Sequence, residues 1–176
     1  FTSSPSNGRK VAVIGSGGAG IACACELRTK GYEVDIYEAK SKPSGLTLHG
    51  IAAYKITNQE VEDEIKFLEK QMDLNFICNH PIESKTQLKK LEAEYDAIFL
   101  GVGIGATAQI GLPGEDKVNV VGAVEFIEEL RMKHHQLTVP NRVVVIGGGN
   151  TAMDAASQSA RMGAESVVLA YRRSKE

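Results

Sequence analysis

The sequence lacks the features that mark membrane, nucleic-acid-binding and secreted proteins. No apolar run approaches the roughly 18 residues that predict a membrane-spanning helix. Basic residues are not in excess, because 20 lysines and arginines face 22 aspartates and glutamates, and a nucleic-acid-binding surface needs a basic field. The first residues hold no apolar core, so they predict no signal peptide. We therefore expect neither a membrane nor a nucleic acid among the partners.

Cysteine is also scarce, with three residues among 176. Cys23 and Cys25 are two apart and Cys78 stands alone, so the spacing fits neither a metal site nor a disulfide framework. This pattern favours a reducing, cytoplasmic setting, and we predict no metal ligands. An initiator methionine is lacking too, and we expect the chain to be part of a longer polypeptide.

Glycine, by contrast, is abundant, with 18 residues of which most lie in three clusters. Two of these clusters follow short, continuous apolar runs that are typical of buried parallel strands. Each is followed by a helix-forming segment and then by another short strand, which makes a βαβ unit. The six elements are expected at 10–14, 21–30, 32–37, 142–146, 152–161 and 166–171. The chain is therefore predicted to hold two nucleotide-binding α/β folds.

The segment between these two units is expected to add further elements. Apolar residues at helical spacing and further short apolar runs predict helices at 58–72, 86–94 and 123–133, strands at 74–78 and 95–100, and an irregular stretch at 39–57. We divide the chain into a polar linker at 1–9, a first domain at 10–110 and the start of a second domain at 111–176.

The first glycine turn, residues 15–20, fits the pattern G-x-G-x-x-G. In a dinucleotide-binding fold the first glycine allows a tight turn, the second lets a pyrophosphate approach the backbone, and the third lets helix and strand pack closely. Glu38 follows Gly20 by 18 residues, at the end of the second predicted strand. A carboxylate at that place can hold both hydroxyls of a ribose. The alternative is an ordinary helix-packing turn with a solvated Glu38.

The second glycine turn, residues 147–152, fits the variant G-x-G-x-x-A. At the end of its second predicted strand there is no acidic residue, because Arg172 and Arg173 follow Tyr171. A carboxylate there would repel a 2′-phosphate, whereas an arginine fork pairs with one. This pattern favours NADP over NAD. The alternative is that the two arginines belong to a basic surface loop.

Four motifs in this chain resemble one known family. They are Val-Ile-Gly-Ser-Gly-Gly-Ala-Gly at 13–20, Leu-Pro-Gly-Glu-Asp at 112–116, Val-Ile-Gly-Gly-Gly-Asn-Thr-Ala-Met-Asp at 145–154 and Tyr-Arg-Arg at 171–173. The chain is similar, over 10–173, to the FAD/NADPH-binding flavoprotein module of the glutamate synthase small subunit and of dihydropyrimidine dehydrogenase. This resemblance implies two tandem Rossmann-like folds arranged as in glutathione reductase, the second truncated.

The resemblance also implies which residues contact each cofactor. FAD would lie on the first fold and NADPH on the second. The residues implied for FAD are Gly15, Ser16, Gly17, Gly18, Ala19, Gly20, Glu38, Ala39, Lys40, Gly45, Leu46, Lys55, Ile82 and Gly103. Those implied for NADPH are Gly148, Gly149, Asn150, Thr151, Arg172 and Arg173.

Three departures from the family pattern bear on these contacts. Gly18 replaces a proline, which should be harmless. Ser44 stands where the family has a glycine, so a backbone that needs a positive φ there would be strained. Lys55 replaces an arginine, which keeps the charge and loses the planar fork. In addition, the second fold ends after one βαβ unit, which is too small to bury its own sheet.

The function implied by the resemblance is hydride transfer from NADPH to FAD, followed by electron transfer to iron–sulfur clusters. Three scattered cysteines cannot hold such a cluster, so the clusters would lie upstream or on a partner subunit or domain. The chemistry needs no side-chain acid or base, and we name no catalytic residue. One alternative is an assembly subunit or fragment that binds FAD or a nucleotide without turnover. Another is a disulfide reductase similar to thioredoxin reductase, although Cys23 and Cys25 lack the Cys-x-x-Cys spacing.

Overall fold

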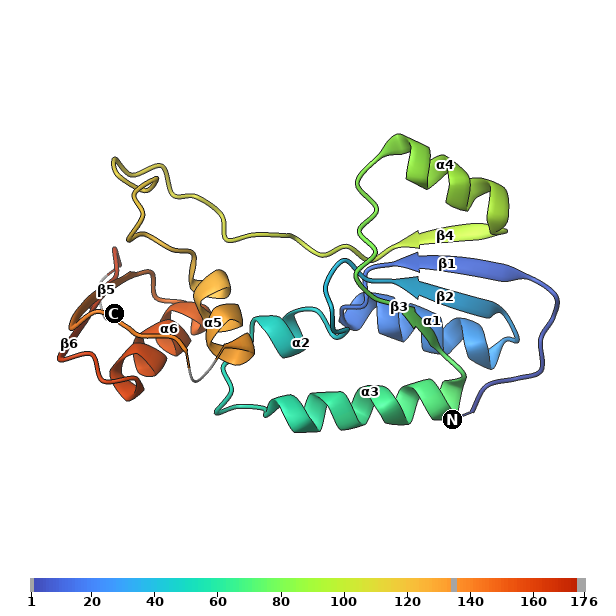
Figure 1. Cartoon of the computed structure of the whole chain (residues 1–176), viewed down its shortest axis with the longest axis horizontal. Coiled ribbons are helices and arrows are strands. Elements are labelled where there is room, and N and C mark those ends of the chain that lie inside the picture. The colour runs from blue at the N-terminus through green and yellow to red at the C-terminus, as the bar shows by residue number, and fades with distance from the viewer. Residues whose placement is uncertain (1, 134–135, 174–176) are drawn as a thin grey trace. The chain divides into compact units, whose positions relative to one another are not determined.

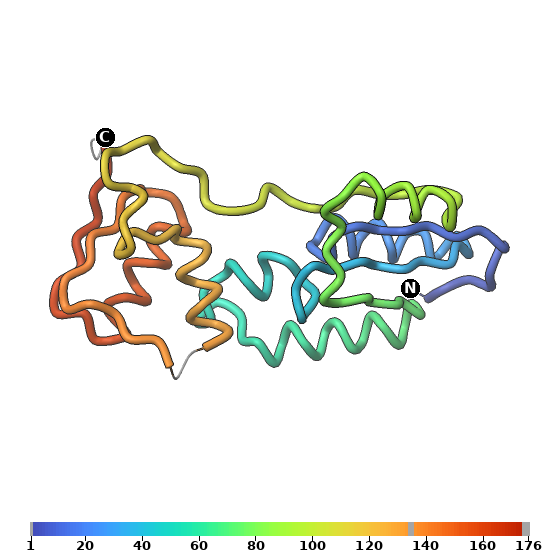
Figure 2. The backbone as a smooth tube through the Cα atoms, turned by 45° about the horizontal axis from the view of Figure 1, so that its top comes forward, coloured from blue at the N-terminus to red at the C-terminus, as the bar shows by residue number. Residues whose placement is uncertain are grey.

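The computed structural model describes residues 2–133 and 136–173, and the chain divides into two compact units (Figure 1). The first unit comprises Phe1–Thr47 and Asn58–Gly105. The second comprises Leu48–Thr57 and Ala106–Glu176. The backbone therefore leaves the first unit after Thr47 and returns to it at Asn58, a path that can be followed in Figure 2. The sequence predicted a single boundary instead, between 110 and 111.

The first unit is built on a four-stranded parallel sheet with the order β3-β2-β1-β4. The strands are β1 (Lys10–Ile14), β2 (Glu33–Tyr37), β3 (Asn75–Ile77) and β4 (Ala97–Leu100). The strands β1, β2 and β3 follow one another toward one edge of the sheet, and the chain then crosses back to place β4 on the other side of β1. Dinucleotide-binding folds have the same change in strand order. The predicted α/β fold with a parallel sheet is confirmed.

Helices cover both faces of this sheet. They are α1 (Gly18–Thr29), α3 (Asn58–Met72) and α4 (Lys85–Glu94). The short α2 (Leu46–His49) precedes α3 in the chain and begins in the first unit, which the backbone leaves after Thr47. Val13 packs against Ala24 of α1 and Met72 of α3 on one face. Ile14 packs against Leu91 of α4 on the other. Because successive strand residues point to opposite faces, β1 is buried on both, which explains its continuous apolar run.

Residues 2–9, predicted to be a polar linker, belong to the first unit. The Ser4 N–H donates to the carbonyl of Arg28 over 2.9 Å, and the Asn7 N–H donates to that of Gly31 over 2.8 Å. A Cβ on Gly31 would lie 2.4 Å from the carbonyl oxygen of Pro5. The polar composition was misleading here, since backbone hydrogen bonds to the end of α1 order the segment without apolar side chains.

The second unit contains a two-stranded parallel sheet and two helices. These are β5 (Arg142–Ile146), β6 (Ser166–Ala170), α5 (Ala123–Met132) and α6 (Asn150–Arg161). Val145 packs against Ala152 and Ala155 of α6 on one face of the sheet. On the opposite face Val144 is 66% exposed and Val168 52% exposed. The unit thus leaves one sheet face uncovered, in line with the expectation that it cannot bury its own sheet.

Residues 48–57 are held in the second unit by α5. Ala52 is buried and packs against Ile127. The guanidinium of Arg131 donates to the carbonyl of Ile51. This long-range packing is the reason why the structure groups the segment with the second unit.

Candidate functional site

The first glycine turn lies between β1 and α1, and two of its glycines are required by close packing. Gly15 has φ +99°, and a Cβ on it would lie 2.4 Å from the carbonyl oxygen of Gly101. A Cβ on Gly20 would lie 1.9 Å from the carbonyl oxygen of Gly15. Both positions therefore exclude larger side chains, in keeping with the roles of the first and third glycines of the motif.

The middle of the same turn is open. A Cβ on Gly17 or on Gly18 would meet no heavy atom within 4 Å, and Ala19 is exposed. Gly17 is the N-cap of α1 and provides no side-chain hydrogen bond to the helix. Backbone N–H groups at the start of a helix favour an anion. This part of the turn therefore has the space and the donors that a diphosphate needs.

Glu38 is buried and directed at the first glycine turn. Its Oε2 atom accepts hydrogen bonds from the Ser16 N–H, over 3.1 Å, and from the Ser16 hydroxyl. Its Oε1 atom accepts the Lys40 N–H over 2.8 Å. Two residues predicted for the same site are thus in direct contact. Ser16 was expected to line the phosphate cradle, but in the structure both of its donors are used by Glu38.

The loop between β2 and α2 lies against the glycine turn. Ser44 has φ +95°, and its N–H donates to the carbonyl of Ser16 over 3.0 Å. A Cβ on Gly45 would lie 2.8 Å from the Cα atom of Gly17. Leu46 begins α2 and its side chain is exposed. The sequence indicated only that a positive φ at this position would strain a serine, and the structure shows that Ser44 does adopt one.

Two further segments predicted for FAD end beside these residues. The His80 N–H donates to the carbonyl of Glu38 over 2.8 Å, and the Asn79 N–H donates to that of Lys40 over 2.9 Å. Ile82, two residues later, packs its side chain into the core beside α4. Ala39 and Lys40 are exposed. The chain after β3 therefore lies next to the end of β2.

The chain after β4 also comes close to the glycine turn. The Gly101 N–H donates to the carbonyl of Ile14 over 2.8 Å. Gly103 has φ +75°, and a Cβ on it would meet nothing within 4 Å. Gly103 thus follows the strand end that contacts Gly15.

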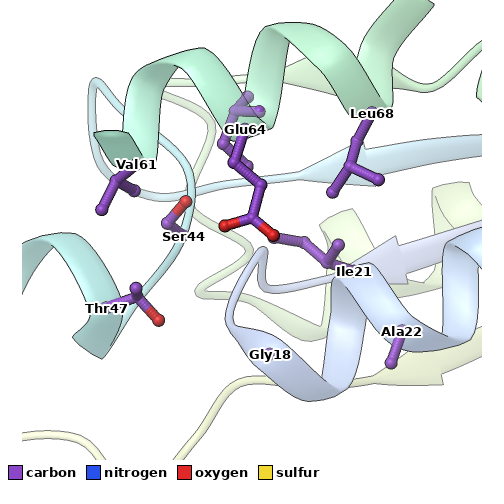
Figure 3. Close-up of a pocket in the computed structure, with 9 residues that line it drawn as sticks. Gly18, Ile21, Ala22, Ser44, Thr47, Val61, Glu64 and Leu68 are labelled. Carbon is purple, nitrogen blue, oxygen red and sulfur yellow. The ribbon is translucent and has the colours of Figure 1, made fainter. Parts of the chain in front are cut away.

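A cavity of about 230 Å³ lies between α1 and α3, and nothing in the sequence indicated it (Figure 3). It is lined by Gly18, Ile21 and Ala22 of α1, Ser44 and Thr47 of the loop and α2, and Val61, Glu64, Ile65 and Leu68 of α3. Figure 3 shows the Glu64 carboxylate pointing from α3 toward Ile21. The helical spacing of the α3 residues indicated a buried face, but gave no sign that packing against α1 would be incomplete.

The second glycine turn lies between β5 and α6, and like the first turn it contains both closely packed and open glycines. A Cβ on Gly148 would lie 2.4 Å from the ring of Tyr171, whereas a Cβ on Gly149 would meet nothing within 4 Å. Asn150 and Thr151 form the exposed first turn of α6. The structure thus brings the predicted NADPH residues of this turn together at one helix start.

Arg172 and Arg173 follow at the same end of this sheet. The Gly147 N–H donates to the carbonyl of Ala170, the last residue of β6, over 2.9 Å. Both arginines come directly after Tyr171, whose ring covers Gly148, and both are exposed. The two arginines therefore lie, exposed, at the end of the sheet that carries the second glycine turn.

Lys55, predicted to lie near FAD, makes its contacts within the second unit. Its ammonium lies 2.7 Å from the carboxylate of Asp154, and the hydroxyl of Tyr54 donates to the same carboxylate over 2.5 Å. The hydrogen bond with Asp154 raises the pKa of Lys55 above its ordinary value. Asp154 is buried. It belongs to a motif that the sequence analysis quoted, but nothing in the sequence indicated its partners.

The cysteines do not form a redox pair in the structure. Cys23, Cys25 and Cys78 are all free thiols. Burial raises the pKa of each of them, whereas a redox-active cysteine needs a lowered pKa. Cys25 packs in the core with Val13 of β1. These three thiols therefore give no support to the disulfide-reductase alternative.

Within residues 2–133 and 136–173, no group of three or more histidine, cysteine, aspartate or glutamate side chains could hold a metal ion. In the same part of the chain, no helix has the length and apolar character needed to cross a bilayer.

Comparison with known proteins finds relatives whose names include a nicotinamide cofactor. It is 37% identical over 179 residues to the glutamate synthase [NADPH] small chain of Escherichia coli, an alignment that covers 96% of this chain and 38% of that one. It is 34% identical over 176 residues to the beta subunit of the NADP(+)-dependent formate dehydrogenase of Moorella thermoacetica, covering 99% of this chain and 25% of that one. The chain thus spans about a quarter to two-fifths of the length of such relatives.

Solved structures show the same fold. FprA from Mycobacterium tuberculosis in complex with NADPH superposes with a TM-score of 0.73 at 23% identity, over 94% of this chain and 43% of that one. The family model described as pyridine nucleotide-disulphide oxidoreductase matches residues 9–176. With nearly the whole length matched and both glycine turns in place, this chain belongs to the pyridine nucleotide-disulphide oxidoreductase family.

Proposed function

We propose that this chain is the FAD- and NADPH-binding module of a larger flavoprotein oxidoreductase, similar to the glutamate synthase small subunit, that passes electrons to an iron–sulfur partner. The observation that carries the proposal is the buried carboxylate of Glu38 fixed beside an open glycine turn. A carboxylate and a diphosphate cradle at this spacing are what the adenosine half of a dinucleotide requires.

The residues of the first unit fit FAD. The open backbone at Gly17 and Gly18 would admit the diphosphate, and the Glu38 carboxylate would accept from the ribose. The exposed Leu46 would provide an apolar surface for the flavin ring. Ala39, Lys40 and the backbone at Ile82 would form the adenine side.

The residues of the second unit fit NADPH. Gly149, Asn150 and Thr151 would hold the diphosphate at the start of α6, and Arg172 and Arg173 would pair with the 2′-phosphate. The names of the relatives include both NADPH-linked and NAD-dependent proteins. The two arginines, which stand directly after Tyr171 at the end of β6 where an NAD-binding fold would have a carboxylate, favour NADPH for this chain.

FAD bound in this family type accepts a hydride from a nicotinamide cofactor and can release electrons one at a time. The contribution of this chain is to bind the two nucleotides and to fix their orientation. It needs no acid or base for that task, which agrees with the lack of a predicted catalytic side chain. The iron–sulfur centre would belong to another part of the enzyme, because three separate thiols cannot ligate it.

The first test is the visible spectrum of the full-length protein and its response to reduced nicotinamides under anaerobic conditions. A yellow protein that is bleached by NADPH supports the proposed oxidoreductase. A yellow protein that is inert to NADPH and NADH indicates a non-catalytic flavin carrier. A protein that is colourless and does not bind added FAD contradicts the proposal.

The second test addresses the choice of nicotinamide. In the variant Arg172→Ala/Arg173→Ala, the apparent affinity for NADPH should fall about tenfold to a hundredfold, as expected for the loss of charge-assisted hydrogen bonds. The affinity for NADH should stay within about twofold, because NADH has no 2′-phosphate. Arg142→Ala is the matched control, since Arg142 is exposed and lies at the end of β5 away from the second glycine turn. Equal losses for both nicotinamides would contradict the assignment.

A further inference from the structure

Ser16 is the second residue of the first glycine turn and is fully buried. All of its polar groups are engaged. Its N–H, over 3.1 Å, and its hydroxyl donate to Oε2 of Glu38, and its carbonyl accepts the Ser44 N–H over 3.0 Å. Ser16 therefore joins the glycine turn to the end of β2 and to the loop before α2, two segments that are predicted to contact FAD.

These contacts leave the two oxygens of the Glu38 carboxylate in different states. A carboxylate offers about four acceptor positions. Ser16 fills two of them on Oε2, and the Lys40 N–H fills one on Oε1 over 2.8 Å. Among the described residues no cation pairs with Glu38, so neutral donors alone hold this buried group. The remaining acceptor position is on Oε1.

We propose that Ser16 is a positioning residue for Glu38: it fixes Oε2 against the glycine turn and leaves Oε1 as the atom that accepts a ribose hydroxyl of FAD. This inference rests on the proposed function, and it adds a residue that touches neither the ribose nor the flavin in this role.

The physical reason is the soft torsion at the end of a glutamate side chain. The terminal torsion of glutamate has broad, roughly two-fold minima, so the carboxylate plane is set by its hydrogen-bond donors. Two donors from one rigid residue set it firmly, because Ser16 is buried and its own backbone is tied to Ser44. A carboxylate that is already oriented loses less entropy when the ribose binds. Without the Ser16 hydroxyl, that orientation has to be gained on binding.

The test compares two ligands that differ only in the ribose. Full-length protein stripped of flavin is titrated calorimetrically with ADP and with 2′,3′-dideoxy-ADP. In Ser16→Ala, the affinity for ADP should fall about threefold to tenfold, as for the loss of one hydrogen bond. The affinity for dideoxy-ADP should remain within about twofold of wild type, since that ligand cannot donate to Glu38. A general structural defect would weaken both ligands equally.

Two controls complete the design. Ser41→Ala removes the hydroxyl of an exposed serine in the loop between β2 and α2, and should leave the affinities for both ligands unchanged. If Ser16→Ala fails to fold, Ser16→Cys keeps nearly the same size with a much weaker donor, and the same ADP-specific loss is expected.

Three results for the Ser16→Ala variant overturn the inference alone. An equal loss for both ligands would make Ser16 merely structural. A gain in ADP affinity would mean that Ser16 competes with the ribose. If Ser16→Ala binds ADP as tightly as the wild type, and the wild type prefers ADP to dideoxy-ADP, then Ser16 does not position Glu38. The proposed function would be unaffected by that result. If the wild type binds neither FAD nor ADP, the proposed function and this inference fail together.

Discussion

The N–H of Ser44 donates to the carbonyl of Ser16 over 3.0 Å while Ser44 itself has φ +95°. A positive φ is costly for a residue with a Cβ, and the cost is accepted where the loop before α2 meets the glycine turn. The structure therefore stores backbone strain next to the predicted flavin site.

Relief of this strain should stabilise the protein. Replacement Ser44→Gly removes a penalty of roughly 1–2 kcal/mol and adds an entropic cost of about 0.5–1 kcal/mol. The free energy of unfolding should thus rise by about 0.5–1 kcal/mol, measured by denaturant unfolding. Ser44→Ala keeps the strained backbone and should show no gain. A gain of the same size in both variants would contradict the explanation.

The carboxylate of Asp154 should be important for the stability of the second unit. It is buried and accepts from Tyr54 and Lys55. Removal of the acceptor in Asp154→Ala should lower the free energy of unfolding by roughly 1–3 kcal/mol, because two donors lose their partner. Asp63→Ala removes an exposed aspartate that pairs with Lys66, and should cost roughly 0–1 kcal/mol. Similar costs for the two variants would contradict the importance of burial.

Glu115 predicts a pH dependence of stability. Hydrogen bonds, first from the N–H of Ile110 and then from those of Gly111 and Leu112, lower the pKa of its carboxyl below the ordinary value of 4.5. A lowered folded-state pKa means that the contribution is complete above pH 4.5 and is lost as the pH falls through the folded-state pKa.

In Glu115→Gln this contribution is removed at every pH. The variant should therefore have a lower unfolding midpoint than the wild type near about pH 7, and the difference should shrink toward about pH 3. Asp116→Asn, which removes the neighbouring carboxylate, is the control for the loss of a negative charge in this loop. A difference that is independent of pH would contradict the role of Glu115.

The two kinds of glycine in the first turn should respond differently to a methyl group. Gly20→Ala places a Cβ 1.9 Å from the carbonyl of Gly15, and the overpacking should cost roughly 1–3 kcal/mol of stability. Gly17→Ala meets nothing within 4 Å, so the unfolding midpoint should stay unchanged while FAD affinity falls about tenfold or more, because the methyl keeps a diphosphate from the backbone. Unchanged FAD affinity in Gly17→Ala would contradict the cradle.

Local patterns predicted the core of the first unit well. The apolar run at β1 and the helical spacing of α3 gave their bounds to the residue, 10–14 and 58–72. α1 begins at Gly18 rather than Ile21, since the glycine turn continues directly into the first turn of the helix. The replacement of a motif glycine by Ser44 indicated where strain would arise if the backbone needed a positive φ, and the structure supplies that φ.

Long-range packing was out of reach of the sequence. Residues 48–57 read as irregular, and only their contacts with α5 and α6 show that they belong to the second unit. The same holds for Ser16, which was assigned to a phosphate on its motif position alone. Its contact with Glu38 depends on the spatial closeness of two strand ends that are 22 residues apart.

The excursion of residues 48–57 has a practical consequence for anyone who dissects this protein. Because each unit consists of two stretches of chain, no single cleavage point yields both in whole form. Truncation after Gly105 would deprive Ala52 of its contact with Ile127 and leave Leu48–Thr57 without the unit against which it packs. Isolated fragments should be designed by replacing that segment with a short linker between Thr47 and Asn58.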